Sequence, residues 1–252
     1  MLRHRVIPCL LLSNEGLVKT RKFRNGTYVG DPINAIRIFN EKEVDELMVL
    51  DINASKEHRE PNYGLISQIA SECFMPLAYG GGIRTMEQAK RIFACGVEKI
   101  CLQTAALESP NIVTELANRF GSQSIVVSVD IKRNWCGQPK IYSTIKGGLM
   151  KKTWLETIKS LVNAGAGEVL MNSVDKDGTL SGPDLDLIRQ VSDEIDVPLI
   201  AVGGIASLAD IKSSVAAGAS AVAAGAFFVF HGPHRAVLIT YPKHHELEQL
   251  FV

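Results

Sequence analysis

The chain has 252 residues, of which 46% are hydrophobic, and its 27 Lys and Arg residues are balanced by 27 Asp and Glu residues. Balanced charge gives no overall attraction to nucleic acid or to an anionic membrane, so neither is expected as a partner. No apolar run approaches the roughly 18 residues of a membrane span, and the amino terminus lacks a signal peptide's apolar region, so we expect a soluble, cytoplasmic protein.

Short apolar runs alternate with amphipathic stretches along the whole chain. The predicted strands cover 6–12, 46–51, 76–80, 99–103, 125–130, 168–173, 199–202 and 221–224. Helices are predicted near 32–42, 62–73, 85–94, 109–120, 153–164, 184–195 and 208–216. Strands that alternate with helices in this way favour a parallel sheet with helical crossovers.

Three segments interrupt this alternation. Residues 13–30 are predicted to form a long loop that carries Lys19, and residues 132–150 are predicted to form a hairpin or a loop insertion. The tail, 231–252, shows no clean amphipathic period, so we expect an irregular segment to close the fold. The five cysteines form no CxxC pair and His231 and His234 lack a third ligand, so no metal and no cofactor is predicted.

The glycine-rich stretch Pro76-Leu-Ala-Tyr-Gly-Gly-Gly-Ile-Arg84 returns 122 residues later as Pro198-Leu-Ile-Ala-Val-Gly-Gly-Ile205. Each copy has a buried strand, then glycines that let backbone approach a ligand, then a helix whose first amides can face an anion. The repeat predicts one (βα)8 barrel over 1–252, built from half-barrels at about 1–122 and 123–230. The two glycine stretches have a functional interpretation, in which each binds a phosphate group, and a structural one, in which each is a simple turn.

Ligands of such barrels bind at the carboxyl ends of the strands. The candidate residues at that rim are Asp51, Gly82, Thr104, Asp130, Ser173, Asp175, Gly203, Gly204, Ala224 and Gly225. The opposite rim collects charges at the strand starts, namely Arg5, Glu46, Lys99 and Glu168. We expect these two cations and two anions to form a ring on the barrel floor, and spacing alone favours a salt bridge that only stabilises the fold.

Motifs along the chain resemble one family in register. They are Gly30-Asp-Pro32, Asp45-Glu-Leu47, Leu50-Asp-Ile52, Gly80-Gly-Gly-Ile-Arg84, Thr104-Ala-Ala106, Arg119-Phe-Gly-Ser-Gln123 and Asp175-Lys-Asp-Gly-Thr179. With them the chain resembles the cyclase subunit of imidazole glycerol phosphate synthase, a half-barrel-repeat family of histidine biosynthesis.

The resemblance implies a glutaminase subunit that docks on the barrel floor and passes ammonia through the barrel. The charge ring then matches the ammonia gate, and Glu98 matches a position that contacts the glutaminase. The resemblance also implies a phosphorylated ligand, with one phosphate at Gly82 and Thr104 and the other at Gly203, Gly204, Ala224 and Gly225. Lys19 matches a lysine that closes over this ligand.

One departure from the family pattern concerns catalysis. The family uses two carboxylates as general acid and base; Asp130 matches one of them, but Leu11 occupies the position of the other and transfers no proton. Gln103, Asn172 and Val202 also differ from the residues usual in the family. The rim residues therefore differ from the family pattern, whereas the floor residues match it. This combination favours a paralogue that still receives ammonia but uses it in another reaction. Relatives of this kind work with a separate amidotransferase that amidates sugars for surface polysaccharide.

Two other interpretations stay open. One is the ordinary histidine-pathway cyclase, a lyase, in which another group replaces the missing acid. The other is the related sugar-phosphate isomerase of the same superfamily, which also needs two acids at these strand ends. Leu11 counts against both.

Overall fold

Eight parallel strands close into a barrel in the computed structural model, which describes residues 4–251. In barrel order they are β1 (Arg5–Ser13), β4 (Leu47–Asp51), β5 (Leu77–Gly80), β6 (Lys99–Leu102), β7 (Ile125–Arg133), β10 (Glu168–Ser173), β11 (Leu199–Val202) and β12 (Ala221–Ala224). β12 pairs with β1, where Arg5 lies opposite Ala221, and this pairing completes the circle. The predicted (βα)8 barrel is confirmed.

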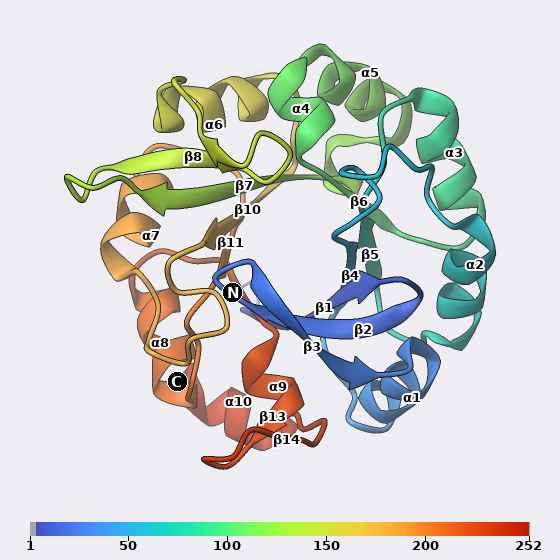
Figure 1. Ribbon diagram of the computed structural model, residues 1–252, viewed down its shortest axis with the longest axis vertical. Helices are drawn as coiled ribbons and strands as arrows, with labels where there is room; N and C mark the ends of the chain where they lie inside the picture. The colour runs from blue at the N-terminus through green and yellow to red at the C-terminus, as the bar shows by residue number, and fades with distance from the viewer. Residues whose placement is uncertain (1–3, 252) are drawn as a thin grey trace.

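Helices surround the barrel as an outer ring (Figure 1). They are α1 (Pro32–Glu41), α2 (Tyr63–Glu72), α3 (Met86–Ala94), α4 (Thr104–Glu108), α5 (Asn111–Phe120), α6 (Trp154–Asn163), α7 (Leu185–Ser192) and α8 (Leu208–Ala216), with a 3-10 turn, η1 (Ser122–Ser124), after α5. Local sequence sets their starts, because Asp31 caps α1 through the amide of Asn34 and Thr85 forms a capping box with Gln88 on α3. Among the described residues, no helix is long and apolar enough to cross a membrane.

Strand residues alternate between two cores. On β10, Val169 and Met171 face the helices, whereas Leu170 faces the barrel lumen. The lumen is filled by small and medium apolar side chains, namely Ile7, Cys9, Met48, Ala78, Cys101, Val126, Leu170, Ile200, Ala221 and Ala223. The interior is therefore a packed core, as expected for this architecture.

The repeat seen in the sequence is also a repeat of elements. β5, α3 and β6 of the first half begin 122 residues before β11, α8 and β12 of the second half. Each glycine stretch thus leaves the end of a strand and enters a helix, as the sequence predicts.

The predicted loop at 13–30 is wrong in its conformation. The segment is an antiparallel hairpin of β2 (Gly16–Arg21) and β3 (Arg24–Gly30), here called the first hairpin, and β2 also pairs with the end of β1. Its turn places Lys22 and Phe23 at positive φ, at 52° and 61°, without a glycine. Because neither residue is typical of such turns, the sequence gives no hairpin signal there.

The insertion at 132–150 is a hairpin, one of the two predicted forms. β7 continues to Arg133 and pairs with β8 (Pro139–Ser143), which pairs with β9 (Gly148–Leu149). We call the β7–β8 pair the second hairpin, and it extends beyond the ring of helices in Figure 1.

The tail contains more regular structure than the sequence predicts. After α9 (Ala226–Val229), the chain forms the short strands β13 (Phe230–His231) and β14 (Ala236–Val237) and then α10 (His244–Leu250). α10 has two turns, too short for a helical period to stand out in the sequence. Before it, the Tyr241 hydroxyl donates to the carbonyl oxygen of Val6 at 2.8 Å and lies 3.4 Å from Asp45 Oδ2, which fixes the tail to the start of β1.

Candidate functional site

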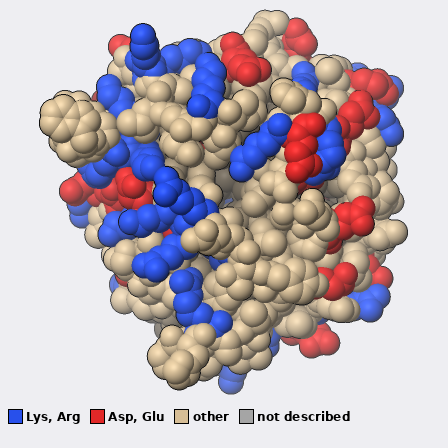
Figure 2. All heavy atoms as spheres, viewed as in Figure 1, with Lys and Arg blue, Asp and Glu red and all other residues tan. Residues whose placement is uncertain are grey.

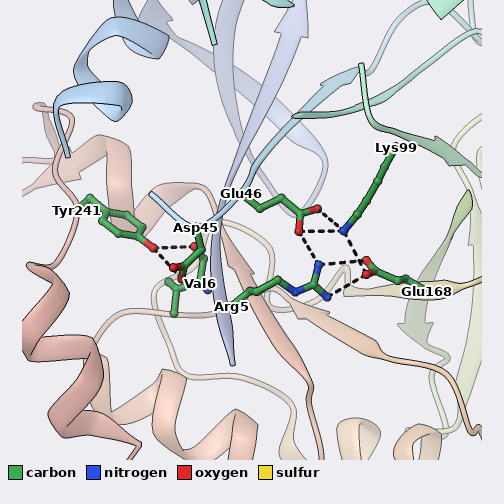
Figure 3. Close-up of polar contacts among 7 residues, drawn as sticks. All are labelled: Arg5, Val6, Asp45, Glu46, Lys99, Glu168 and Tyr241. Atoms are coloured by element: carbon green, nitrogen blue, oxygen red, sulfur yellow. Dashed lines mark hydrogen bonds and ion pairs between the residues drawn. The ribbon is translucent and has the colours of Figure 1, made fainter. Parts of the chain in front are cut away.

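The four floor charges form a closed ring of ion pairs (Figure 3). Arg5 contacts Glu46 at 2.5 Å and Glu168 at 3.0 Å, and Lys99 contacts the same two carboxylates at 3.0 and 3.1 Å. Each cation thus bridges both anions across four strands. The geometric prediction of a ring of two cations and two anions is confirmed.

The charge ring is largely removed from water. The side chain of Glu46 is 2% exposed, and those of Glu168 and Lys99 are 11% and 17% exposed. Burial alone lowers the pKa of Arg5, but the carboxylates of Glu168 and Glu46 together hold this pKa above its ordinary value. Removal of any one member leaves three largely buried charges with a net charge of one, so the ring is most stable as a neutral unit of four.

At the other end of the barrel, the strand ends surround a cavity that we call the cup. Asp130 on β7 lies at its base with 5% of its surface exposed, and the Gln103 side-chain amide donates a hydrogen bond to its Oδ2. Burial raises the pKa of Asp130 to about 7, the Gln103 hydrogen bond opposes this rise, and the charge of Asp177 adds to it. A carboxyl group with such a pKa can give or accept a proton near neutral pH.

The opposite wall of the cup is apolar. Leu11 on β1 is in register with Leu50 on β4, and Val202 at the end of β11 lines the same cavity. All three also pack against the apolar lumen. Leu11, Leu50 and Val202 therefore offer no group that donates or accepts a proton, although Lys19, Asp51 and Asp177 line other parts of the same cavity.

The first hairpin is held over the cup by one carboxylate. Asp177, in the loop after β10, accepts from Lys19 Nζ at 2.7 Å, from Thr20 Oγ1 at 3.1 Å and from the Phe23 amide at 3.4 Å. Lys19 and Asp177 are both buried. Gly178 permits this close approach, because it has a φ of 64° and a Cβ there would collide with the Thr20 carbonyl oxygen.

The two hairpins also meet each other. The rings of Phe23 and Tyr142 pack edge to face at 6.1 Å, and both Phe23 and Thr144 line the cup. Figure 2 shows Lys and Arg side chains gathered over the region of the second hairpin, whose segment carries Lys132, Arg133, Lys140 and Lys146. Although the net charge is zero, this side of the face has a local positive potential that suits an anionic ligand.

The comparisons with known proteins agree with this geometry. The model of the family described as "Histidine biosynthesis protein" matches residues 5–233. The chain belongs to the histidine biosynthesis protein family.

Relatives within the family match the chain over nearly its whole length. A Pseudomonas aeruginosa protein provisionally named imidazole glycerol phosphate synthase subunit hisF2 is 52% identical, over 98% of this chain and 99% of its own. A Vibrio vulnificus protein with the same provisional name, numbered hisF3, is 51% identical over 96% and 94%. A Leptospira interrogans protein named in the same way as HisF is 46% identical over the full length of both chains. The resemblance to the cyclase subunit is confirmed.

The fold brings together only part of the residues predicted for this family's ligand. Those that line the cup are Leu11, Lys19, Asp51, Gly82, Thr104, Asp130 and Gly225. Ser173, Asp175, Gly203, Gly204 and Ala224 lie around the same strand ends but outside the cup lining. Asp175 accepts a 2.8 Å hydrogen bond from the Arg133 amide, so it fixes the second hairpin.

Several residues that line the cup were not among the site residues predicted from the sequence. Thr20 and Phe23 are brought there by the first hairpin, which the sequence did not predict, and Asp177 lies in the loop after β10 that binds this hairpin. The motif Asp175-Lys-Asp-Gly-Thr179 contains Asp177 and was the one signal that could have identified it. Among residues 4–251, no three His, Cys, Asp or Glu side chains gather as a metal site requires.

Proposed function

We propose that this protein is an ammonia-accepting synthase subunit. A glutaminase partner docks on the floor of the barrel, ammonia enters at the charge ring of Arg5, Glu46, Lys99 and Glu168, and the barrel delivers it to the cup for a glutamine-dependent nitrogen transfer. The observation that carries this proposal is the neutral ring of ion pairs at one end of the barrel together with an altered cup at the other.

The floor supports a partner subunit. The relatives in Pseudomonas aeruginosa and Vibrio vulnificus are named as subunits of a synthase, which implies a complex in those proteins. Glu98 precedes Lys99 of the ring and is exposed, so it is available to a protein that covers the floor. In this proposal Glu98 contacts the glutaminase.

The cup supports a use of ammonia other than ordinary cyclisation. Leu11 lies where the second proton-transferring carboxylate of the cyclase would be, and its neighbours Leu50 and Val202 offer no replacement. Loss of a positioned acid or base removes about 100- to 10,000-fold in rate. We therefore favour transfer of the nitrogen to another acceptor. In this proposal the acceptor is a sugar bound by a separate amidotransferase, and the amidated sugar is used in surface polysaccharide synthesis.

The ligand sites of this proposal follow the two glycine cradles. Gly82 and Thr104 hold one phosphate, and Gly203, Gly204, Ala224 and Gly225 hold the other, largely through backbone amides. Gly82 and Gly203 both have positive φ, at 74° and 107°, which turns the chain sharply at each strand end. Lys19 pairs with Asp177 and lies beside the second cradle, because a Cβ at Gly225 would lie 3.1 Å from Lys19 Cε.

The second candidate function is the ordinary cyclase, which converts the phosphoribulosyl aminoimidazole-carboxamide ribonucleotide and ammonia to imidazole glycerol phosphate. The retained Asp130, with a pKa of about 7, favours it.

Partner docking is tested with the glutaminase subunit from the same organism. The intact chain is expected to bind it in a 1:1 complex and to raise its rate of glutamine hydrolysis. Glu98→Lys is expected to weaken binding at least about tenfold, because reversal of a charge at an interface costs more than about 1.4 kcal/mol.

Glu87→Lys, which reverses an exposed charge on α3, is the matched control and is expected to bind normally. Isothermal titration calorimetry measures both affinities. If the chain does not bind the glutaminase, or if both variants bind equally well, the proposed docking surface is wrong.

A further inference from the structure

A tryptophan stands in water at the tip of the second hairpin. Trp135, in the turn between β7 and β8, has 96% of its surface exposed. Hydrogen bonds hold this turn, because Asn134 Oδ1 accepts from the amides of Cys136 and Gln138 at 3.0 and 2.9 Å. An aromatic ring that is already held in place loses little freedom on binding, and Trp is enriched among the residues that dominate protein–protein affinity. The tip therefore has the character of an anchor for a partner.

The segment that contains this tip concentrates positive charge. Residues 132–152 contain six basic residues and no acidic one. The six are Lys132, Arg133, Lys140, Lys146, Lys151 and Lys152. Of these, only Arg133 forms an ion pair with a residue that the structure describes, and its partner is Asp184. Since the chain as a whole is neutral, the gathering of Lys and Arg over this region in Figure 2 is a local feature.

Two of these lysines face each other across the second hairpin. Lys132 on β7 is directly opposite Lys140 on β8, and both are partly exposed. The other face of the same strands carries Ile131 opposite Ile141, which are both buried. Like charges directly opposite in an antiparallel pair are destabilising. The face with the two lysines thus costs stability in the free protein, and an anionic partner would remove this cost.

This face begins at the cup. Tyr142 follows Lys140 on the same side of β8, and its ring packs against Phe23 of the first hairpin. Thr144, one further step along that side, lines the cup. The face therefore runs from the mouth of the cup out to Trp135, at the opposite end of the barrel from the charge ring.

The chemistry of the face selects a protein as its occupant. An apolar anchor surrounded by cations fits a protein surface that is acidic around an apolar pocket. Single-stranded nucleic acid is bound by several stacked aromatic rings, whereas Trp135 is the one aromatic residue of 132–152 that is fully exposed. A membrane surface requires a continuous apolar face, but the exposed Ile145 and Leu149 lie beyond the other end of β8.

We propose that the second hairpin is the docking surface for the enzyme that takes up the nitrogen, which presents an acidic surface with a pocket for Trp135. This docking site rests on the proposed function and deepens it, because it gives the two partners opposite ends of the barrel. The glutaminase covers the floor, and the sugar amidotransferase covers the mouth of the cup.

The anchor is tested with the purified amidotransferase from the same organism and the full chain, without the glutaminase. Isothermal titration calorimetry measures the affinity. Trp135→Ala is expected to weaken binding at least about tenfold, because truncation of a central aromatic anchor removes most of its buried contact. Phe74→Ala is the matched control, since Phe74 precedes β5 at the floor and is also largely exposed, at 84%. This control is expected to bind the amidotransferase normally.

A second variant separates binding from folding. Lys140→Glu replaces the like-charge pair with Lys132 by an opposite-charge pair, so its melting temperature is expected not to fall. Its affinity for the amidotransferase is expected to fall at least about tenfold and to depend less on salt, because a cation of the interface is reversed. Lys90→Glu, on α3 across the barrel from the second hairpin in Figure 1, is the control with unchanged affinity.

The outcomes that contradict the proposal are equally definite. No binding of the amidotransferase by the unmodified chain, or equal binding by Trp135→Ala and Phe74→Ala, would overturn it. A single-stranded oligonucleotide and vesicles of anionic phospholipid are titrated in parallel. Binding of either probe that Lys140→Glu abolishes would assign the face to that class of partner instead.

This test is separable from the test of floor docking. Glutaminase binding without amidotransferase binding would contradict only the docking site on the second hairpin. Amidotransferase binding without glutaminase binding would contradict the proposed floor docking and leave this site in place.

Discussion

At the scale of single residues, Asp130 has an unusual environment for a carboxyl group, because it is buried at the base of the cup. Burial raises its pKa to about 7, although Gln103 donates a hydrogen bond that favours the charged form. The folded state therefore holds a proton on this carboxyl group over a pH range in which the unfolded chain has lost it. The burial that raises the pKa of Asp130 therefore lowers the free energy of unfolding at neutral pH.

This cost gives a pH-dependent prediction for Asp130→Asn. Between about pH 4 and pH 7 the unfolded chain ionises this residue while the folded chain resists, so the unmodified protein loses stability as pH rises through that window. The asparagine cannot ionise, so the variant is expected to be more stable by roughly 2–4 kcal/mol at pH 8 and about equally stable at pH 4.

Urea unfolding at the two pH values measures this difference in free energy. A variant that is destabilised by the same amount at pH 4 and pH 8 would show that Asp130 is not buried as a proton-holding group.

At the scale of elements, the loop after β10 holds both hairpins at the mouth of the cup. Asp177 binds the first hairpin, and Asp184, the cap of α7, forms a 2.9 Å ion pair with Arg133 of the second. Gly178 also accepts a 2.8 Å hydrogen bond from Arg235 of the tail. One loop therefore sets the position of three segments that are distant in sequence.

This role predicts that Asp177→Asn loosens the first hairpin without unfolding the barrel. The change leaves the Lys19 ammonium group buried without an anion and weakens the bonds to Thr20 and Phe23. The amides of Lys22 and Phe23 are expected to exchange hydrogen at least about tenfold faster, as a local opening requires.

Hydrogen exchange followed by NMR measures these amides, with Asp186→Asn as the control because its ion pair with Arg189 lies at the surface. Unchanged exchange at Lys22 and Phe23 would mean that strand pairing alone holds the hairpin.

The sequence predicts elements well where local chemistry decides them. Asp31, Thr85 and the glycines after β5 and β11 mark helix starts and strand ends that agree with the structure. The first hairpin was missed because its turn residues, Lys22 and Phe23, carry no turn signal and are held by Asp177 from 154 residues away in sequence. Long-range contacts of this kind have no local pattern.

The same distinction applies to the site. Strand alternation predicts that Asp130, Leu11 and the four ring charges face the barrel axis, because residue position alone fixes the direction of a strand side chain. The partner of Lys19 depends on a side-chain contact between the first hairpin and the loop after β10, which no spacing in the chain encodes.

At the scale of the whole molecule, two chemically different ends are joined by one apolar interior. The charge ring of Arg5, Glu46, Lys99 and Glu168 lies at the floor, and the cup with Asp130 lies at the mouth. Between them the lumen is packed with apolar side chains, several of them alanines. In the proposed function, this apolar interior selects uncharged ammonia over an ion, because burial of an unpaired charge is costly. In the proposed function, the charge ring is the entrance for ammonia, and the cup retains Asp130 but has Leu11 in place of the second catalytic acid.

The most direct test of this account is the cyclase reaction itself. The purified chain is given the phosphoribulosyl aminoimidazole-carboxamide ribonucleotide and saturating ammonium, beside a Leu11→Asp variant, and loss of substrate absorbance is followed. We expect no measurable turnover by the unmodified chain and a gain of at least about 100-fold in the variant, the size of one restored acid or base. Turnover by the unmodified chain at the rate of an ordinary cyclase would contradict the account and make this protein the cyclase of histidine biosynthesis.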